Sequence, residues 1–142
     1  EQRQIAKERI PIIAKSLLEC KQGTTTIDEI TIELAESGKA NFCYSDSNNY
    51  DDVFHIGLGE VLCKSDPKMV YCGLFEQGEK IRAIVYAGDE ISKEKSAGDI
   101  VKSISQILGG AGGGSAKFAQ GGGTDKSKKE DAIKNAKSMI IE

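Results

Sequence analysis

A glycine-rich segment near the carboxyl end is the part of this sequence whose residue types best suit binding chemistry. Eight of the fifteen residues from Gly109 to Gly123 are glycine, which is half of the glycine in the chain. Because glycine has no Cβ, its backbone N–H groups and peptide planes can come close to a ligand. Flexible linkers share this composition, but the segment contains the apolar pair Phe118-Ala119 and does not separate two globular units. We therefore expect a ligand-binding, glycine-rich loop over residues 109–123.

This segment does not fit the two common phosphate-binding loops. A Walker A loop has lysine and then serine or threonine after its last glycine, whereas Gly114 is followed by Ser115 and Ala116. A dinucleotide-binding loop follows a strand and opens a helix, whereas these glycines follow a predicted helix. The remaining interpretation is a flat surface that packs against exposed nucleosides, while Lys117 and neighbouring lysines contact phosphates.

The overall charge excludes a strongly basic protein but leaves room for a local positive face. The 142 residues carry a formal net charge of −3, unlike proteins held on nucleic acid by bulk phosphate neutralisation. Between Lys93 and Lys129, seven lysines and three acidic residues give a local balance of +4. Two interpretations stay open for these lysines, namely solvated helix faces or a positive surface beside the glycines.

No set of side chains suits catalysis. His55 is the single histidine, and its apolar neighbours Phe54 and Ile56 favour a helix-surface or partly buried position over a general base. Asp51 and Asp52 are adjacent and indicate a helix N-terminal cap rather than an acid–base pair. We therefore predict that the chain itself is catalytically inert and uses no cofactor.

The four cysteines are predicted to be reduced core residues of an intracellular protein. They are Cys20, Cys43, Cys63 and Cys72. They form no Cys-x-x-Cys pair and lie at no metal-ligand spacing from the histidine, so we expect no zinc site.

No apolar run approaches the ~18 residues of a membrane-spanning helix. The start at Glu1 shows no signal-peptide pattern and indicates a piece of a longer polypeptide, so we expect a cytoplasmic location and no membrane partner.

A helical lead-in is expected over residues 1–22. Its apolar residues recur with helical spacing and are Ile10, Ile13, Ala14, Leu17 and Leu18. Pro11 suits the first turn of this helix, or a kink in a longer helix that starts near Gln2. The lead-in could act as a linker or pack on a second copy of itself.

The rest of the chain, residues 23–142, is expected to form one globular domain. Alternating apolar residues predict strands over 41–46, 69–75 and 80–87, the last two joined as a hairpin through residues 76–79. A helix is predicted from Val53 to about Lys64. Residues 24–38 are ambiguous: Thr26-x-x-Glu29 is a capping box, but the alternation from Ile30 to Leu34 favours a strand paired with 41–45.

Two helices are predicted on either side of the glycine segment. Ser96-x-x-Asp99 opens the first, which Gly109 ends, and Ser127-x-x-Glu130 caps the second. The apolar face of the second contains Ala132, Ile133, Ala136 and Ile140. These elements predict an α/β fold, a small mixed β-sheet packed with helices and preceded by the helical lead-in.

Three segments together resemble a known family. Residues 97–102 (Ala-Gly-Asp-Ile-Val-Lys), the glycine run 109–114 and residues 118–123 (Phe-Ala-Gln-Gly-Gly-Gly) are similar to the DHH-associated domain. That family includes the C-terminal domain of alanyl-tRNA synthetases and a domain of DHH phosphoesterases. The resemblance is densest over residues 69–141. It implies an arm that holds the tRNA elbow, couples aminoacylation with editing of mischarged tRNA and, in several members, mediates dimerisation.

By position, the resemblance assigns tRNA contact to the glycine run and its flanks. These residues are Lys102, Gly109, Gly110, Gly112, Gly113, Gly114, Ser115, Lys117, Gln120, Gly122 and Gly123. Many synthetases have arginine and aspartate where this chain has Ser115 and Lys117, which weakens a bidentate phosphate clamp here. The phosphoesterases have a histidine directly after their glycines, and this chain has none there.

The resemblance also implies partners. They are the tRNA elbow, the catalytic and editing domains of a parent alanine–tRNA ligase, and a second copy in a homodimer. ATP and zinc would belong to the parent chain only. Two alternatives remain, a structural dimerisation domain with little tRNA binding and the substrate-binding domain of a phosphoesterase.

Overall fold

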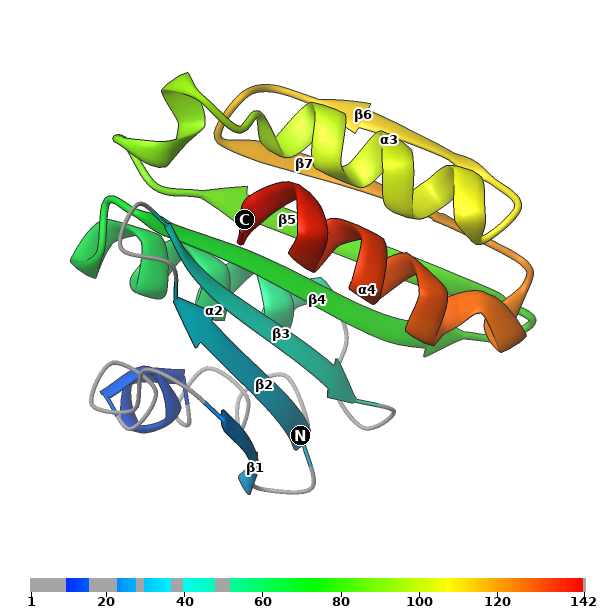
Figure 1. Cartoon of the computed structure of the whole chain (residues 1–142). Helices are drawn as coiled ribbons and strands as arrows, with labels where there is room; N and C mark the ends of the chain where they lie inside the picture. The colour runs from blue at the N-terminus through cyan, green and yellow to red at the C-terminus, as the bar shows by residue number, and fades with distance from the viewer. Residues whose placement is uncertain (1–9, 16–22, 28–29, 37–39, 48–51, 142) are drawn as a thin grey trace.

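The computed structural model describes residues 10–15, 23–27, 30–36, 40–47 and 52–141. Within these residues, seven strands form one sheet in the order β1-β2-β3-β4-β5-β7-β6, with helices on both faces (Figure 1). The β3–β4 pair is parallel and the other neighbouring pairs are antiparallel. The predicted α/β fold with a mixed sheet is therefore confirmed.

The strands are β1 (Gly23–Ile27), β2 (Ile30–Glu36), β3 (Asn41–Ser47), β4 (Met69–Gln77), β5 (Lys80–Ala87), β6 (Ala111–Gly114) and β7 (Phe118–Gly123). The helices are α2 (Asp52–Ser65), α3 (Ala97–Ile107) and α4 (Lys129–Ile140), with short 3₁₀ turns η1 (Ile91–Lys93) and η2 (Lys126–Lys128). Residues 10–15 are also helical. The strands predicted over 41–46, 69–75 and 80–87 and the helix predicted over 53–64 are confirmed.

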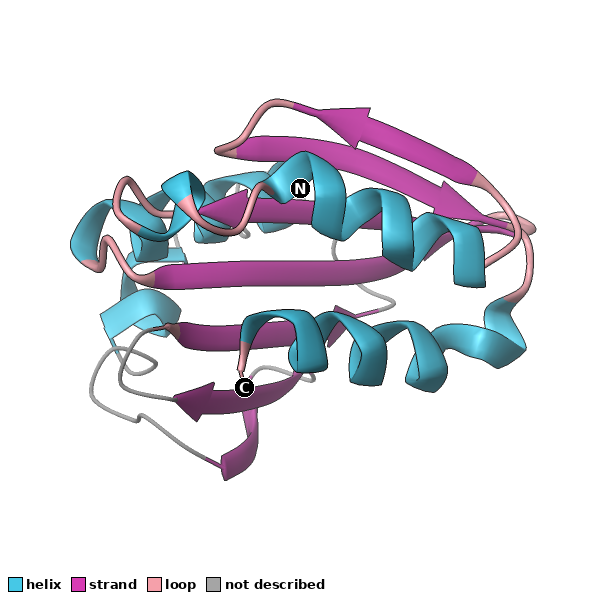
Figure 2. Ribbon diagram, turned by 45° about the horizontal axis from the view of Figure 1, so that its top comes forward, coloured by secondary structure: helices cyan, strands magenta, loops and turns pink. Residues whose placement is uncertain are grey.

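The sheet separates two apolar clusters. Helices α3 and α4 cover one face (Figure 2), where Val70, Cys72 and Leu74 of β4 meet the alternating apolar side chains of β5. Helix α2 crosses over between the parallel strands β3 and β4, and it packs with residues 10–15 on the other face around Phe54 and Tyr71. The period-two alternation therefore assigned the β4 and β5 side chains to the correct faces. Of the lead-in residues, Ile10, Ile13 and Ala14 are buried as predicted, and Leu17 and Leu18 lie outside the described residues.

The ambiguous segment is a strand. Residues 30–36 form β2, which pairs antiparallel with β3 from Thr31↔Asp46 to Glu36↔Asn41. The strand interpretation is confirmed and the helix interpretation is wrong, because pairing with β3 lets Ile32 and Leu34 be buried on one face. A separate strand β1 precedes it, which the sequence did not predict.

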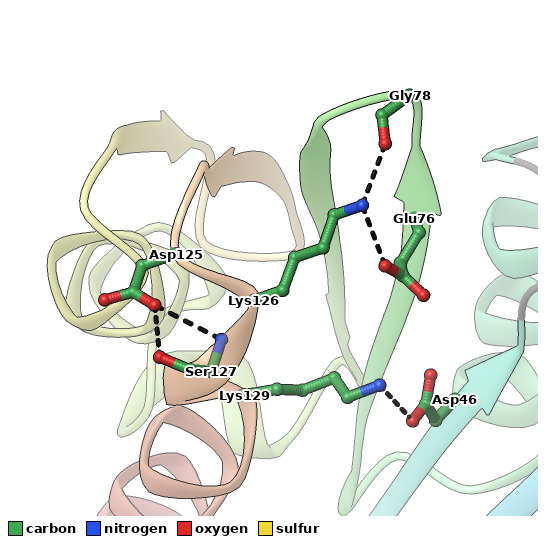
Figure 3. Close-up of polar contacts among 7 residues, drawn as sticks. All are labelled: Asp46, Glu76, Gly78, Asp125, Lys126, Ser127 and Lys129. Atoms are coloured by element: carbon green, nitrogen blue, oxygen red, sulfur yellow. Dashed lines mark hydrogen bonds and ion pairs between the residues drawn. The ribbon is translucent and has the colours of Figure 1, made fainter.

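The last helix begins differently from the prediction. Ser127 lies in the 3₁₀ turn η2, and α4 begins at Lys129. The Ser127 backbone N–H donates to the carboxylate of Asp125 at 3.2 Å (Figure 3). The predicted Ser127 cap of α4 is therefore wrong, because the chain makes an Asp125-capped 3₁₀ turn first. The predicted apolar face of α4 is confirmed, since its four residues are buried.

His55 is fully buried, so the predicted surface or partly buried position is wrong. Its Nδ1 lies 2.7 Å from the Tyr71 hydroxyl and 3.2 Å from the Ser45 hydroxyl. Gly73 provides the space, since a Cβ there would lie 2.5 Å from Nδ1. The ring also stacks on Phe75 with centroids 5.2 Å apart. Hydrogen bonds from two strands thus make a buried imidazole tolerable.

Cys43, Cys63 and Cys72 are buried and form no disulfide, as predicted, whereas Cys20 lies outside the described residues. Burial raises the pKa of the Cys63 thiol to about 12.

In the described part of the chain, no cluster of three or more histidine, cysteine or acidic residues could hold a metal ion. None of the described helices has both the length and the apolar character needed to cross a membrane.

Candidate nucleic-acid interface

The glycine segment is a β-hairpin rather than the predicted loop. Strands β6 and β7 pair antiparallel, with Gly113 opposite Gln120, and β7 also pairs with β5. At the turn, the Ser115 backbone N–H donates to the Phe118 carbonyl at 2.9 Å, and the Ser115 hydroxyl accepts from the Phe118 N–H at 3.1 Å. Glycine has low strand propensity. The hairpin nevertheless forms two strands of the sheet, because β7 pairs with β5, and it lies at one edge of the sheet (Figure 1).

One face of this hairpin packs directly under α3. The Ser105 hydroxyl in α3 accepts a hydrogen bond from the Gly122 N–H at 3.1 Å. A Cβ on Gly121 would lie 2.2 Å from that hydroxyl, and a Cβ on Gly123 would lie 2.1 Å from the Leu108 carbonyl oxygen. These glycines therefore serve helix–sheet packing, because any side chain would push α3 off the hairpin.

The start of α3 is hydrogen-bonded to the turn of the hairpin. At the start of the helix, the N–H groups of Ala97 and Gly98 donate to the carbonyls of Ala116 and Ser115 at 2.8 and 3.0 Å. These bonds satisfy helix N–H groups for which Ser96 offers no side-chain cap. At the other end, Gly109 has φ +80° and ends the helix as predicted. The hairpin is therefore held in place by α3 and β5 together.

Apart from Phe118, which contacts Tyr86, and Gln120, the opposite face of the hairpin carries little side-chain material. Cross-strand partners share a face, so the pairs Ala111↔Gly122 and Gly113↔Gln120 lie away from α3. Ala111 is exposed, and Gly113, Gln120 and Gly122 are half-buried. On this side of the sheet, α2 packs on β4 and β5. The outer face of the hairpin is thus an accessible surface made mostly of backbone.

A groove of about 430 Å³ lies at the end of the hairpin away from its turn, beside the first residues of β5. It is lined by Lys80, Ile81, Arg82, Gly109, Gly110, Ala111, Gln120, Gly121, Gly122, Gly123 and Thr124. Arg82 of β5 is directly opposite Gly122, and a Cβ on Gly122 would lie 2.2 Å from the Ile81 carbonyl oxygen. Arg82 is half-buried, and its buried Nε has no hydrogen-bond partner among the described residues. Among the described residues, no acidic side chain lines the groove.

Three of the seven lysines expected to form a positive face are instead paired with acidic residues. Lys126 contacts Glu76 and the Gly78 carbonyl, both at 2.8 Å, and Lys129 contacts Asp46 at 2.7 Å (Figure 3). At the hairpin turn, Lys117 is 2.7 Å from Asp89. This hydrogen bond and the lysine charge hold the pKa of Asp89 below its ordinary value. The net positive charge predicted from the lysine count is therefore partly neutralised by these three ion pairs.

The structure brings some of the predicted site residues together and separates others. Those in the groove are Gly109, Gly110, Gln120, Gly122 and Gly123. Gly112 faces α3, since a Cβ there would lie 2.7 Å from the Ser105 hydroxyl, and Gly114 is closely packed against Ala119. Ser115 and Lys117 lie at the turn. The exposed Lys102 of α3 reaches over the edge strand, with its Cε 3.8 Å from a Cβ built on Gly113.

Lys80 and Arg82 were missed by the sequence analysis. The alternation of β5 places Lys80 and Arg82 on the outer face of the sheet, whereas Ile81 and Ala83 lie on the other face. This alternation is visible in the sequence, but it places Arg82 beside the glycines only when β5 is known to pair with β7. The pairing joins residues about 40 positions apart, which no local pattern predicts.

Comparisons with known proteins place this geometry in context. The DHHA1 domain family matches residues 41–142. The chain is 43% identical over 136 residues to an alanine–tRNA ligase of Nitrosopumilus maritimus, covering 96% of this chain and 14% of that protein. It is 41% identical over 92 residues to the alanine–tRNA ligase of Cenarchaeum symbiosum, covering 65% of this chain and 10% of that protein. The chain thus spans a small part of these relatives.

A solved structure has the same fold. The crystal structure of the C-Ala domain from Aquifex aeolicus alanyl-tRNA synthetase superposes with a TM-score of 0.71 at 25% sequence identity. The match covers 78% of this chain and 99% of that one.

Proposed function

The chain belongs to the DHHA1 domain family, as a C-terminal domain of the alanyl-tRNA synthetase type, and from this premise we propose that its glycine hairpin binds tRNA. The observation that carries the proposal is the outer face of β6 and β7. This face is accessible backbone, and α3 holds the hairpin in place from the opposite face. Arg82 borders it, and none of the described residues that line the groove is acidic. Such a surface can pack flat against nucleosides while cations contact phosphates.

The proposed target is the elbow of the tRNA, where the D and T loops expose stacked nucleosides. Residues at the groove and beside it would make the contact, Gln120 and Lys102 among them. By holding the elbow, the domain would couple aminoacylation with editing in a cytoplasmic alanine–tRNA ligase. The domain itself would bind no cofactor and catalyse no reaction.

Titration of the 142-residue chain with whole tRNA and with an acceptor-stem minihelix tests this function. Whole tRNA should bind more tightly, with an affinity that is at best about micromolar and falls as salt is added, because phosphate contacts release counterions. The minihelix lacks the elbow and should bind at least tenfold more weakly. Equal affinity for both RNAs would contradict elbow binding.

A second proposed function is self-association through the lead-in. The observation favouring it is Ile12, whose side chain is 59% exposed on the helical residues 10–15. Sedimentation over a concentration series, for the wild-type chain and for an Ile12→Glu variant that keeps the buried residues of the lead-in, tests it. Dimers that depend on the lead-in are expected, and a monomer at every concentration would contradict the proposal.

A further inference from the structure

Arg82 differs from the three lysines near the hairpin that are ion-paired. Lys117, Lys126 and Lys129 each contact a carboxylate within 2.8 Å. Arg82 forms no ion pair with a described residue, and its Nε is buried without a hydrogen-bond acceptor. A buried N–H donor without a partner is costly, so it is expected where a ligand supplies the acceptor.

The surroundings of Arg82 favour an anionic acceptor. Its cross-strand neighbours are Phe75 in β4 and Gly122 in β7, neither of which carries a charge. Glu76, the adjacent acidic residue of β4, is one position along the strand and therefore on the other face of the sheet, where it binds Lys126. Lys80, on the same face as Arg82, adds a second positive charge to the groove lining.

Arg82 is half-buried and lines the groove directly opposite Gly122, which has no side chain. Glycine at this position has φ +154°, which other residues rarely adopt, and a Cβ would also collide with the β5 backbone. An approaching group can therefore reach Arg82 over bare peptide. Guanidinium groups bind phosphate through two parallel N–H···O bonds, whereas an ammonium group acts as a point charge.

We infer that the groove binds a backbone phosphate of the RNA, and that Arg82 holds this phosphate rather than the ion-paired Lys117, Lys126 and Lys129. The inference rests on the proposed function and deepens it by naming the contacted group and the residue. It also gives this chain a bidentate phosphate ligand from β5, although the positions after the glycine run hold Ser115 and Lys117 instead of arginine and aspartate.

Binding of whole tRNA by the wild-type chain and by Arg82→Gln, Arg82→Lys and Lys117→Gln variants tests the inference. Arg82→Gln should lose about tenfold in affinity, and its slope of log K against log salt should fall by ~0.7–0.9, which corresponds to one lost phosphate contact. Arg82→Lys should retain the slope but lose part of the affinity, because it keeps the charge and loses the fork. Lys117→Gln, already paired with Asp89, should stay within about twofold of wild type.

A second measurement follows Arg82 directly. In the ¹⁵N-labelled wild-type chain, the Nε–Hε signal of Arg82 should shift when tRNA is added, and circular dichroism should show that each variant is folded. Wild-type affinity in Arg82→Gln, an equal loss in Lys117→Gln, or an unmoved Nε–Hε signal would overturn the inference while leaving tRNA binding intact. If the wild-type chain bound tRNA no better than the minihelix, the proposed function itself would fail.

Discussion

The Ser105 hydroxyl of α3 accepts a hydrogen bond from the Gly122 N–H of β7 at 3.1 Å, across a contact that no side chain of the hairpin interrupts. Gly122 belongs at once to this contact and to the groove on the outer face. The glycines of the segment therefore have two separable roles. Gly112, Gly121 and Gly123 allow α3 to pack closely, whereas Gly113 has no atom within 3.8 Å of a built Cβ.

Replacing Gly121 by alanine is expected to destabilise the fold. Its Cβ would lie 2.2 Å from the Ser105 hydroxyl and 2.8 Å from the Gly112 Cα. Because backbone must move to relieve this overlap, we expect a loss of about 1–3 kcal/mol in the free energy of unfolding. Urea denaturation followed by circular dichroism measures it.

Gly113→Ala is the matched control for that experiment. Its Cβ meets only the flexible end of Lys102 at 3.8 Å, so the free energy of unfolding should stay equal or rise by up to about 1 kcal/mol. Equal destabilisation by both substitutions would contradict the assignment of the two glycines to different faces.

Much of the fold was predictable because its elements have local patterns. The β4–β5 hairpin and helix α3 follow from alternation and from an apolar stripe that Gly109 ends. The β6–β7 hairpin was not, because glycine carries no hydropathy pattern and its pairing depends on β5 and α3.

The site was predictable only in part, for the same reason. The glycine segment was identified by composition, but its two faces and the neighbouring Arg82 depend on strand register. His55 was placed wrongly because its partners Ser45 and Tyr71 come from β3 and β4, far from it in sequence. Contacts between distant segments are what single-sequence patterns cannot supply.

Tyr71→Phe should destabilise the protein through the buried polar cluster. The Tyr71 hydroxyl lies 2.5 Å from the Ser45 hydroxyl and 2.7 Å from Nδ1 of His55. Removing it takes a hydrogen-bond partner from both buried groups, so we expect a loss of about 1–3 kcal/mol. Thermal unfolding compared with Tyr86→Phe, a control whose ring is only partly buried, measures the effect. Equal melting temperatures for Tyr71→Phe and wild type would contradict this role.

Lys126→Met should raise the pKa of Glu76. The hydrogen bond from Lys126 and its charge hold the pKa of Glu76 below the ordinary value of 4.5. Without the lysine, the pKa should return toward 4.5, as an NMR titration of the side-chain carboxyl would show. The contribution of the pair to stability is present above the unfolded-state pKa and is lost as pH falls through the lowered native value. Stability of the variant and wild type should therefore converge in acid.

Lys128→Met is the control for the electrostatic prediction. Lys128 is exposed in the same 3₁₀ turn, so its removal should leave the Glu76 titration near that of wild type. A Glu76 pKa unchanged by Lys126→Met would show that the pair shown in Figure 3 does not form in solution.

Affinity of a Gly113→Leu variant for whole tRNA is the most direct test of the central claim, that the bare outer face of the hairpin binds the RNA. A Cβ at Gly113 would meet only the flexible end of Lys102 at 3.8 Å, so the fold should persist while an RNA packed flat on the backbone is displaced. Ser138→Leu, on the exposed side of α4, is the matched control. We predict at least a tenfold loss for Gly113→Leu and wild-type affinity for Ser138→Leu. Wild-type affinity in a folded Gly113→Leu variant would contradict the claim.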